Sequence, residues 1–124
     1  LSGLVGSEMC IRDSYKTALA TDLDPQIGVK RLEPFVNWLI KHNKKGHIGE
    51  FGVPAEDESG LKALDQTLAY LQQHCIPFAY WAAGPSWGKN KLSVEPIKGV
   101  DRPQWAVLQK YLGGGNCTSI GPGT

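Results

Sequence analysis

The stretch Gly49-Glu50-Phe51-Gly52 places a carboxylate among glycines at the end of a short apolar run. We predict that this run, residues 47–51, forms a β-strand. A glutamate at the end of a buried strand costs free energy unless it is hydrogen-bonded or used for a function. The neighbouring glycines would let backbone or substrate approach the carboxylate closely. Glu50 is therefore a candidate functional residue, and the alternative is that its side chain turns outward to solvent.

Two tryptophans mark a second stretch with chemical potential. Trp81 lies near the end of the apolar run 76–82, and Trp87 follows in a loop of small residues. A flat indole can bury the apolar C–H face of a sugar ring, so one interpretation is a pyranose-stacking platform, and the alternative is core packing. Polar neighbours that could bond sugar hydroxyls are Ser86, Lys89 and Asn90. The irregular stretch 83–102 is long enough to suggest a function rather than a mere connection.

A first helix is predicted before the glutamate strand. Apolar residues at helical spacing run from Leu32 to Ile40. Pro34 fits the first turn of such a helix, and Gly46 is a plausible C-terminal cap. We assign Trp38 to the buried core.

Two further helices are predicted around the tryptophan strand. An apolar stripe through residues 61–75 indicates the second helix, with Asp57 or Ser59 as its N-cap. The third is predicted within residues 101–112, where we assign Trp105 to the buried side. The order helix, strand, helix, strand, helix implies a parallel sheet built from βαβ units.

The strand ends decide where chemistry can occur in this α/β architecture. Reactive groups of parallel sheets and barrels gather on the loops at the carboxyl ends of the strands. Glu50 and Trp81 both occupy that position. Two strands alone cannot form a stable parallel sheet, because each needs neighbours at its edges and cover on both faces. We therefore expect the chain to be an incomplete portion of a larger fold.

Composition excludes several partners and prosthetic groups. The 13 basic and 12 acidic residues leave a net charge of +1, so no basic field favours nucleic acid or an anionic membrane. No apolar run approaches a membrane span. The three cysteines, Cys10, Cys75 and Cys117, show no metal-ligand spacing with the histidines. A Cys75–Cys117 disulfide is possible, but the sequence alone does not establish it.

The two ends of the chain differ from its middle. Residues 1–14 have no clear period and resemble translated adapter sequence, so we expect a non-native or disordered segment. No signal peptide is visible there. Residues 15–112 carry the periodic pattern described above. Residues 113–124 are rich in Gly, Ser, Thr and Pro, which is typical of a flexible tail.

Residues 25–112 resemble the C-terminal end of a glycoside hydrolase family 5 enzyme, a (β/α)8 TIM barrel. The likeness rests on the run GHIGEFGVPAEDESGLKALDQTLAYLQQHCIPFAYWAAGPSWG and on the flanking helices RLEPFVNWLIKHN and DRPQWAVLQKYL. It implies about two strands and three helices of that barrel. The pairing of IGEFG with a downstream YWAAGPSWG most resembles the cellulase branch, which cleaves β-1,4-glucan.

The resemblance implies a role for each matching residue. Glu50 matches the catalytic nucleophile, and Trp81 matches the tryptophan that stacks under the sugar at the cleavage point. Trp87, with Ser86 and Lys89 in the same loop, is expected to contact neighbouring glucose units. Retaining hydrolysis with two carboxylates about 5 Å apart follows, with no metal and no other cofactor. We expect the complete protein to be secreted and monomeric.

One departure from the family pattern is large. The acid/base glutamate of the family follows an asparagine on the fourth strand, and no Asn-Glu pair occurs in this sequence. The chain alone is therefore expected to be inactive. Two alternatives stay open: a β-mannanase, xyloglucanase or β-1,3-glucanase on the same barrel, or a non-catalytic carbohydrate-binding module that uses its tryptophans.

Overall fold

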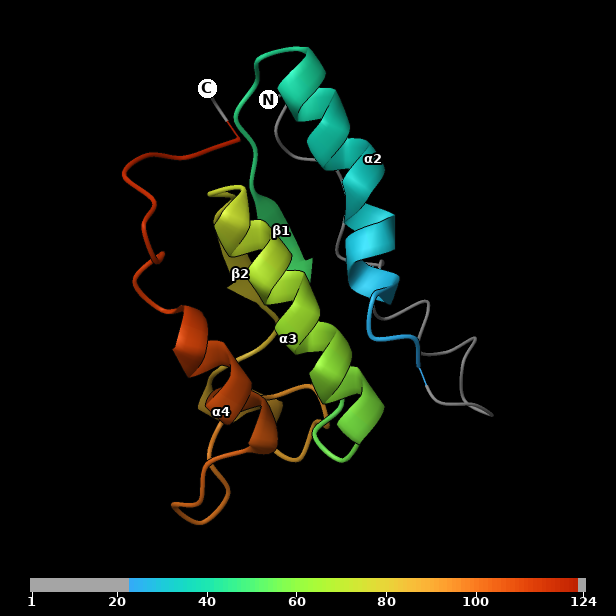
Figure 1. Cartoon of the computed structure of the whole chain (residues 1–124). Coiled ribbons are helices and arrows are strands. Elements are labelled where there is room, and N and C mark those ends of the chain that lie inside the picture. Colours follow the sequence, from blue (N-terminus) through green and yellow to red (C-terminus); the bar gives the residue numbers. More distant parts are fainter. Residues whose placement is uncertain (1–22, 123–124) are drawn as a thin grey trace.

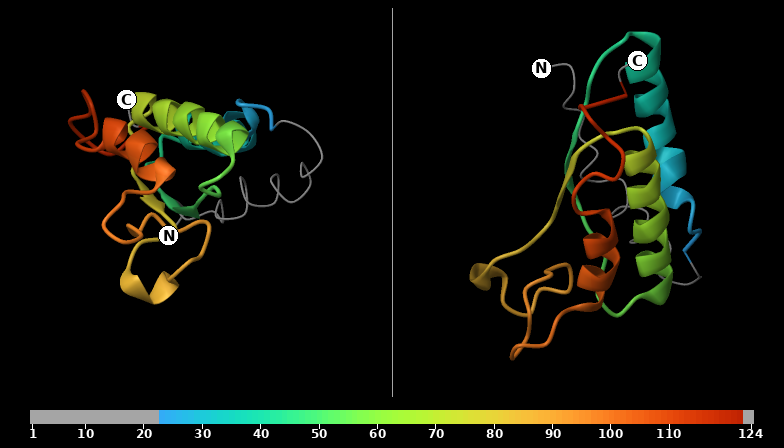
Figure 2. Two further views of the ribbon diagram at one scale, coloured as in Figure 1. Left: turned by 90° about the horizontal axis from the view of Figure 1, so that it is seen from below. Right: turned by 60° about the vertical axis from the view of Figure 1, so that its left-hand side comes forward.

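The computed structural model describes residues 23–122. Its elements are α2 (Ile27–Lys41), β1 (Ile48–Phe51), α3 (Glu58–Gln73), β2 (Phe78–Tyr80) and α4 (Pro103–Leu108), with short 3-10 helices η2 (Pro85–Trp87) and η3 (Gln109–Tyr111). The two strands pair in parallel. The three α-helices form one layer, and both strands lie on the same side of it (Figures 1 and 2). The predicted βαβ arrangement is confirmed.

A core of apolar side chains fills the space between this sheet and the helices. Its buried members are Leu32, Val36 and Leu39 from α2, Ile48 and Phe51 from β1, Leu64, Leu68 and Leu71 from α3, Leu108 from α4, and Val53 and Ile76 from the connections. Burying one such side chain contributes roughly 1.5–3 kcal/mol. On the sheet itself, Gly49 and Ala79 are exposed. The sheet therefore has one face packed on the helices and one face that the described residues leave open.

Helix α2 begins earlier than predicted. It starts at Ile27, so Pro34 lies inside the helix rather than in its first turn. Proline has no N–H to donate to the carbonyl of Lys30, but Pro34 is exposed, and water can reach that side of the helix. The early start is stabilised by tertiary packing: Gly28 is buried so close to Thr67 of α3 that a side chain there would overlap its hydroxyl.

Both long helices end in the same way. Each has a residue with positive φ just after its C-cap, Asn43 at +49° and Cys75 at +55°. The following N–H returns to the helix, from Lys44 to the carbonyl of Leu39 at 2.8 Å and from Ile76 to that of Leu71 at 2.9 Å. These are Schellman motifs. Gly46 is therefore not the cap that we predicted.

Gly46 instead allows close packing beside α2. A Cβ atom at this position would lie 2.6 Å from Leu39 Cδ1. At the other end of the next helix, the predicted N-cap of α3 is confirmed: Asp57 accepts a hydrogen bond from Ser59 N–H at 3.0 Å. A side-chain cap is visible from the local sequence, whereas the steric requirement at Gly46 arises only when the chain folds back along α2.

The two tryptophans assigned to the core differ in outcome. Trp105 is half-buried and packs against the core, as predicted. Trp38 is 41% exposed and its ring lies 4.7 Å from that of His42, so its assignment to the core is wrong within the described structure. The reason is geometric. The buried stripe of α2 passes through Leu32, Val36 and Leu39, and Trp38 projects from a different side of the helix.

The C-terminal segment packs against the rest of the chain. Cys117 forms a disulfide with Cys75, confirming that pairing. Gly121 donates from its N–H to the carbonyl of Cys75 at 2.7 Å and accepts from Gly46 N–H at 3.0 Å. In Figure 1 this red segment runs from α4 back toward the end of α2. Residues 113–122 thus differ from the flexible tail that we expected, whereas the expected segment 1–14 lies outside the described residues.

Candidate active site

The carboxyl ends of β1 and β2 lie side by side. Phe51 is paired with Tyr80, and Trp81 donates from its N–H to the carbonyl of Phe51 at 2.8 Å. Glu50 immediately precedes Phe51, and Trp81 immediately follows Tyr80. Parallel pairing therefore brings the carboxylate residue and the indole residue to the same end of the sheet. This is the carboxyl end of the strands, where reactive groups of such folds gather.

The exposure of β1 shows how Glu50 is placed. Ile48 and Phe51 are both buried although they are three residues apart, and the register of the ladder is irregular between them. A regular strand alternates its faces with a period of two. The irregularity lets both apolar side chains reach the core, and it leaves Gly49 exposed and Glu50 half-buried. Glu50 is thus accessible at the end of the strand.

Gly52 permits the close approach of the two strand ends. A Cβ atom here would overlap the carbonyl oxygen of Trp81. Gly49 is different, because a Cβ atom there would meet no described atom within 4 Å. The sequence suggested that the glycines near Glu50 permit a close approach, but only the structure shows that Gly52 makes it and that the neighbour is the backbone of Trp81.

Two of the predicted substrate-binding residues are in contact. The rings of Trp81 and Trp87 lie 4.5 Å apart between centroids, at an angle of 61°. Trp81 is half-buried and Trp87 is 39% exposed. The peptide bond between Trp81 and Ala82 is cis. Ser86 lies beside Trp87 in η2 and is exposed, as is Lys89 just after it, so all four residues share one loop at the strand end.

The loop after β2 is tied down by polar groups that sequence reasoning did not single out. Glu95 accepts a hydrogen bond from Gly84 N–H at 2.8 Å, and Val94 N–H donates to the carbonyl of Ala82 at 2.9 Å. The Tyr80 hydroxyl and the Gln104 side chain bind backbone groups that follow β1 and backbone groups that follow β2. Burial raises the pKa of Tyr80 to about 12, against the smaller opposing effect of its hydrogen bonds. The phenol is therefore neutral in this network.

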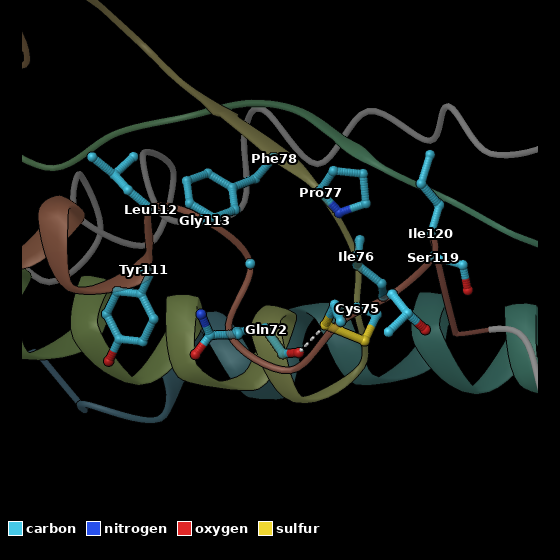
Figure 3. A pocket seen from close by; sticks show the side chains of 13 residues that line it. Gln72, Cys75, Ile76, Pro77, Phe78, Tyr111, Leu112, Gly113, Ser119 and Ile120 are labelled. Atoms are coloured by element: carbon cyan, nitrogen blue, oxygen red, sulfur yellow. Dashed lines mark hydrogen bonds between the residues drawn. A yellow bond between two sulfur atoms is a disulfide. The ribbon is translucent and has the colours of Figure 1, made fainter.

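A cavity of about 480 Å³ lies elsewhere in the molecule. It is bounded by the beginning of β2, the last residues of α3 and the C-terminal segment, and the Cys75–Cys117 disulfide borders it (Figure 3). Its lining is mostly apolar. Because Phe78 lines it and Trp81 does not, the cavity is at the opposite end of β2 from the candidate site. We do not assign catalysis to it.

Residues 23–122 contain neither a metal-ligand cluster nor a membrane-spanning helix. No group of three or more histidine, cysteine or carboxylate side chains there is arranged to hold a metal ion. No helix in the same range is long and apolar enough to cross a membrane.

Comparison with known proteins decides the family. The family model described as Cellulase (glycosyl hydrolase family 5) matches residues 11–86, more than half of the chain. The chain belongs to glycosyl hydrolase family 5. The matched range includes Glu50, Trp81 and Ser86. Homologues in this family are enzymes, and the strands and helices described above are part of its TIM barrel.

Similar proteins are endoglucanases of fungi and bacteria. Endo-beta-1,4-glucanase A of Emericella nidulans is 33% identical over 92 residues, which are 71% of this chain and 28% of that protein. The endoglucanase Cel5A of Pseudomonas stutzeri in complex with cellobiose superposes with a TM-score of 0.80 at 48% identity, over 84% of this chain and 31% of that one. An endo-beta-1,4-glucanase of Xanthomonas axonopodis pv. citri gives a TM-score of 0.66 at 31% identity, over 71% and 29%.

Coverage of these relatives is partial. The chain spans about a quarter of the length of the curated relatives and about a third of the solved structures. This family 5 chain therefore supplies one portion of a barrel, as the lack of further strands predicted.

Proposed function

We propose that this chain is the C-terminal portion of a family 5 enzyme, called the parent enzyme below, that hydrolyses β-1,4-glucan with retention of configuration. Glu50 is the nucleophile in this proposal, and Trp81 is the floor on which the sugar stacks at the point of cleavage. The observation that carries it is the parallel pairing of the two strand ends, because it puts a carboxylate residue beside an indole residue at one edge.

The chemistry follows from that placement. Glu50 attacks the anomeric carbon of the stacked glucose and forms a glycosyl-enzyme, while a second carboxylic acid protonates the leaving oxygen. The same second group then acts as a base, and water releases the sugar from Glu50. Stacking on Trp81 holds the ring in position for attack, which lowers the entropic part of the barrier.

The second carboxylate is expected from the upstream part of the barrel. No Asn-Glu pair of the kind that carries it in this family occurs in the 124 residues. The purified chain should therefore show no turnover of carboxymethylcellulose. Measurable turnover that Glu50→Gln abolishes would contradict this division of the active site.

Further contacts with the polysaccharide are assigned to the loop after β2. Trp87 is exposed and touches Trp81, so it can stack a neighbouring glucose unit. Ser86 and Lys89 lie exposed in the same loop and can hydrogen-bond sugar hydroxyls. The names of the relatives support β-1,4-glucan over mannan or β-1,3-glucan, and initial rates on a panel of these polysaccharides test that preference.

The deciding experiment replaces Glu50 in the parent enzyme. Glu50→Gln keeps the shape of the side chain and removes the nucleophile, so kcat should fall by roughly 10³-fold or more. Glu33→Gln is the matched control, because Glu33 is an exposed residue on α2 and should leave kcat unchanged. Cellobiose affinity should persist in Glu50→Gln. Full activity in this variant would refute the nucleophile assignment. A non-catalytic carbohydrate-binding module predicts instead that the unchanged parent protein has no turnover and that Glu50→Gln leaves its glucan binding intact.

A second measurement identifies the covalent step directly. A 2-deoxy-2-fluoro glucoside with a good leaving group slows the release step more than the attack, so a glycosyl-enzyme should accumulate. Peptide mapping by mass spectrometry should locate the added sugar on Glu50. Attachment at another residue, in a fully active enzyme, would overturn the assignment.

We also propose that the parent enzyme is secreted and acts as a monomer. The Cys75–Cys117 disulfide supports secretion, because such bonds persist in oxidising compartments and are rare in the cytosol. Activity in the culture medium and light scattering of the purified parent enzyme test the two statements.

A further inference from the structure

We infer that Tyr80 and Gln104 are positioning residues that clamp the loop after β1 to the loop after β2. The inference rests on the proposed function, because its consequence is the spacing between the Glu50 and Trp81 strand ends. The two side chains together bind the backbone at Val53, Lys91 and Leu92.

The hydrogen bonds of the clamp can be assigned proton by proton. Gln104 Nε2 carries two hydrogens and donates to the carbonyls of Val53 at 3.1 Å and Lys91 at 2.9 Å. Two carbonyl acceptors require the NH2 end of the amide at this position, which fixes the orientation of the side chain. Gln104 thereby joins the two loops with one amide group.

Tyr80 completes the network. Its oxygen accepts from Val53 N–H at 3.3 Å, and the carbonyls of Val53 and Leu92 both lie 3.0 Å from it. The hydroxyl has one proton, and either carbonyl can accept it. Donation to Leu92 links the loop after β2, while the Val53 carbonyl accepts from Gln104 and the Val53 N–H donates to the Tyr80 oxygen. Each loop is then held by both side chains.

Because these hydrogen bonds are buried, they limit the movement of the two loops relative to each other. The side chain of Gln104 is completely buried, and Tyr80 is largely so. Hydrogen bonds shielded from water are strong, and breaking one leaves an unsatisfied backbone group. The backbones of the two loops make little direct contact with each other. Among the described residues, one main-chain hydrogen bond joins the loops, from Ala55 N–H to the carbonyl of Lys91. The side chains therefore supply most of the connection.

The clamp is adjacent to the reacting groups on both sides. Tyr80 directly precedes Trp81, and Val53 follows Glu50 by three residues. Lys91 and Leu92 follow Trp87 by four and five residues in the loop after β2. A shift of Val53 relative to Tyr80 thus changes the distance from the nucleophile to the stacked sugar. A displacement of about 1 Å in such a geometry can cost about 100-fold in rate.

Two conservative variants of the parent enzyme test the clamp. Tyr80→Phe removes only the hydroxyl, and Gln104→Met keeps the length of the side chain without its donors. We expect each to lower kcat by about 10-fold or more while KM changes by less than about 3-fold, because sugar stacking persists but the attack distance does not. We expect the double variant to lose less than the product of the two single losses.

The matched control is Tyr111→Phe. Tyr111 also donates its hydroxyl to a neighbour, Asp65 Oδ1 at 2.8 Å, but it lies on η3, away from the strand ends. This variant should lower the melting temperature and leave kcat unchanged. If Tyr80→Phe and Gln104→Met also lower only the melting temperature and keep a normal kcat, the clamp is overturned and the two residues have only a structural role.

The outcomes also separate the clamp from the proposed function. Failure of the nucleophile assignment appears as an active Glu50→Gln enzyme. Failure of the clamp appears as Tyr80→Phe and Gln104→Met with normal kcat, in an enzyme that Glu50→Gln inactivates. Should one clamp variant fail to fold, the other still gives a kcat and a KM to compare with Tyr111→Phe.

Discussion

Removing the Cys75–Cys117 disulfide should destabilise the parent enzyme substantially without impairing its chemistry. The bond joins residues 42 apart in sequence. Loop-closure entropy for about 42 residues amounts to roughly 13 cal/mol/K, or about 4 kcal/mol at 25 °C. The closed loop contains β2, the loop after β2 and α4. Breaking the disulfide therefore raises the conformational entropy of these segments in the unfolded chain, and folding must then order them at a greater cost.

The assay is denaturant unfolding of the parent enzyme with and without a thiol reductant. Cys117→Ala should lower the free energy of unfolding by up to about 4 kcal/mol, the entropic value, from which any strain of the bridge in the native state subtracts. In the variant Cys75→Ala/Cys117→Ala, reductant should have no further effect. At a temperature where the parent enzyme and the variant both remain folded, kcat should be unchanged. The disulfide lies near the beginning of β2, whereas Trp81 follows the end of that strand.

Two results would refute this reasoning. A loss below about 1 kcal/mol in Cys117→Ala would mean that the bridge does not constrain the chain as its span requires. A fall in kcat equal to that of a clamp variant would mean that the bridge acts on the site itself. A reductant effect that persists in the double variant would reveal a further disulfide elsewhere in the parent enzyme.

Two more perturbations follow from the strand ends. Gly52→Ala should cost about 1–3 kcal/mol of stability and lower kcat, because the added Cβ must displace the carbonyl of Trp81. Gly49→Ala, with open space at its Cβ, should stay within about 0.5 kcal/mol, and equal effects in the two variants would contradict the close approach. Burial raises the pKa of Tyr80 to about 12, so between about pH 10 and 12 the unfolded chain loses this proton while the folded one keeps it. The free energy of unfolding should thus fall over that interval by up to about 3 kcal/mol, and Tyr80→Phe should flatten the fall in a pH series of unfolding curves.

Much of the local structure was predictable from the sequence. Alternation of apolar runs with helical stripes predicted both strands, and Asp57 as the N-cap of α3 was among the two candidates named. The parallel pairing followed from the order of the elements. The strands and the cap depend on neighbours within a few residues, and the parallel pairing depends on the order of elements along the chain, so the printed sequence contains the information that decides them.

Errors arose where distant segments decide the outcome. Pro34 was expected in a first turn, but contact between Gly28 and Thr67 extends the helix beyond it. Trp38 was expected in the core, yet the buried stripe of α2 does not include it. Helix length and burial reflect packing against a second element, which local spacing does not specify.

For the candidate site, the amino-acid sequence by itself determined which residues could do chemistry and that they end two parallel strands. Only the tertiary structure decided how those strand ends are held. Gly52 touches the backbone of Trp81, and Gln104 binds Val53 across 51 positions of sequence. Cys117 likewise returns to Cys75 across 42. Such contacts form because the folded chain brings remote backbone groups into a buried space where each must find a partner, and no local pattern announces which partner that will be.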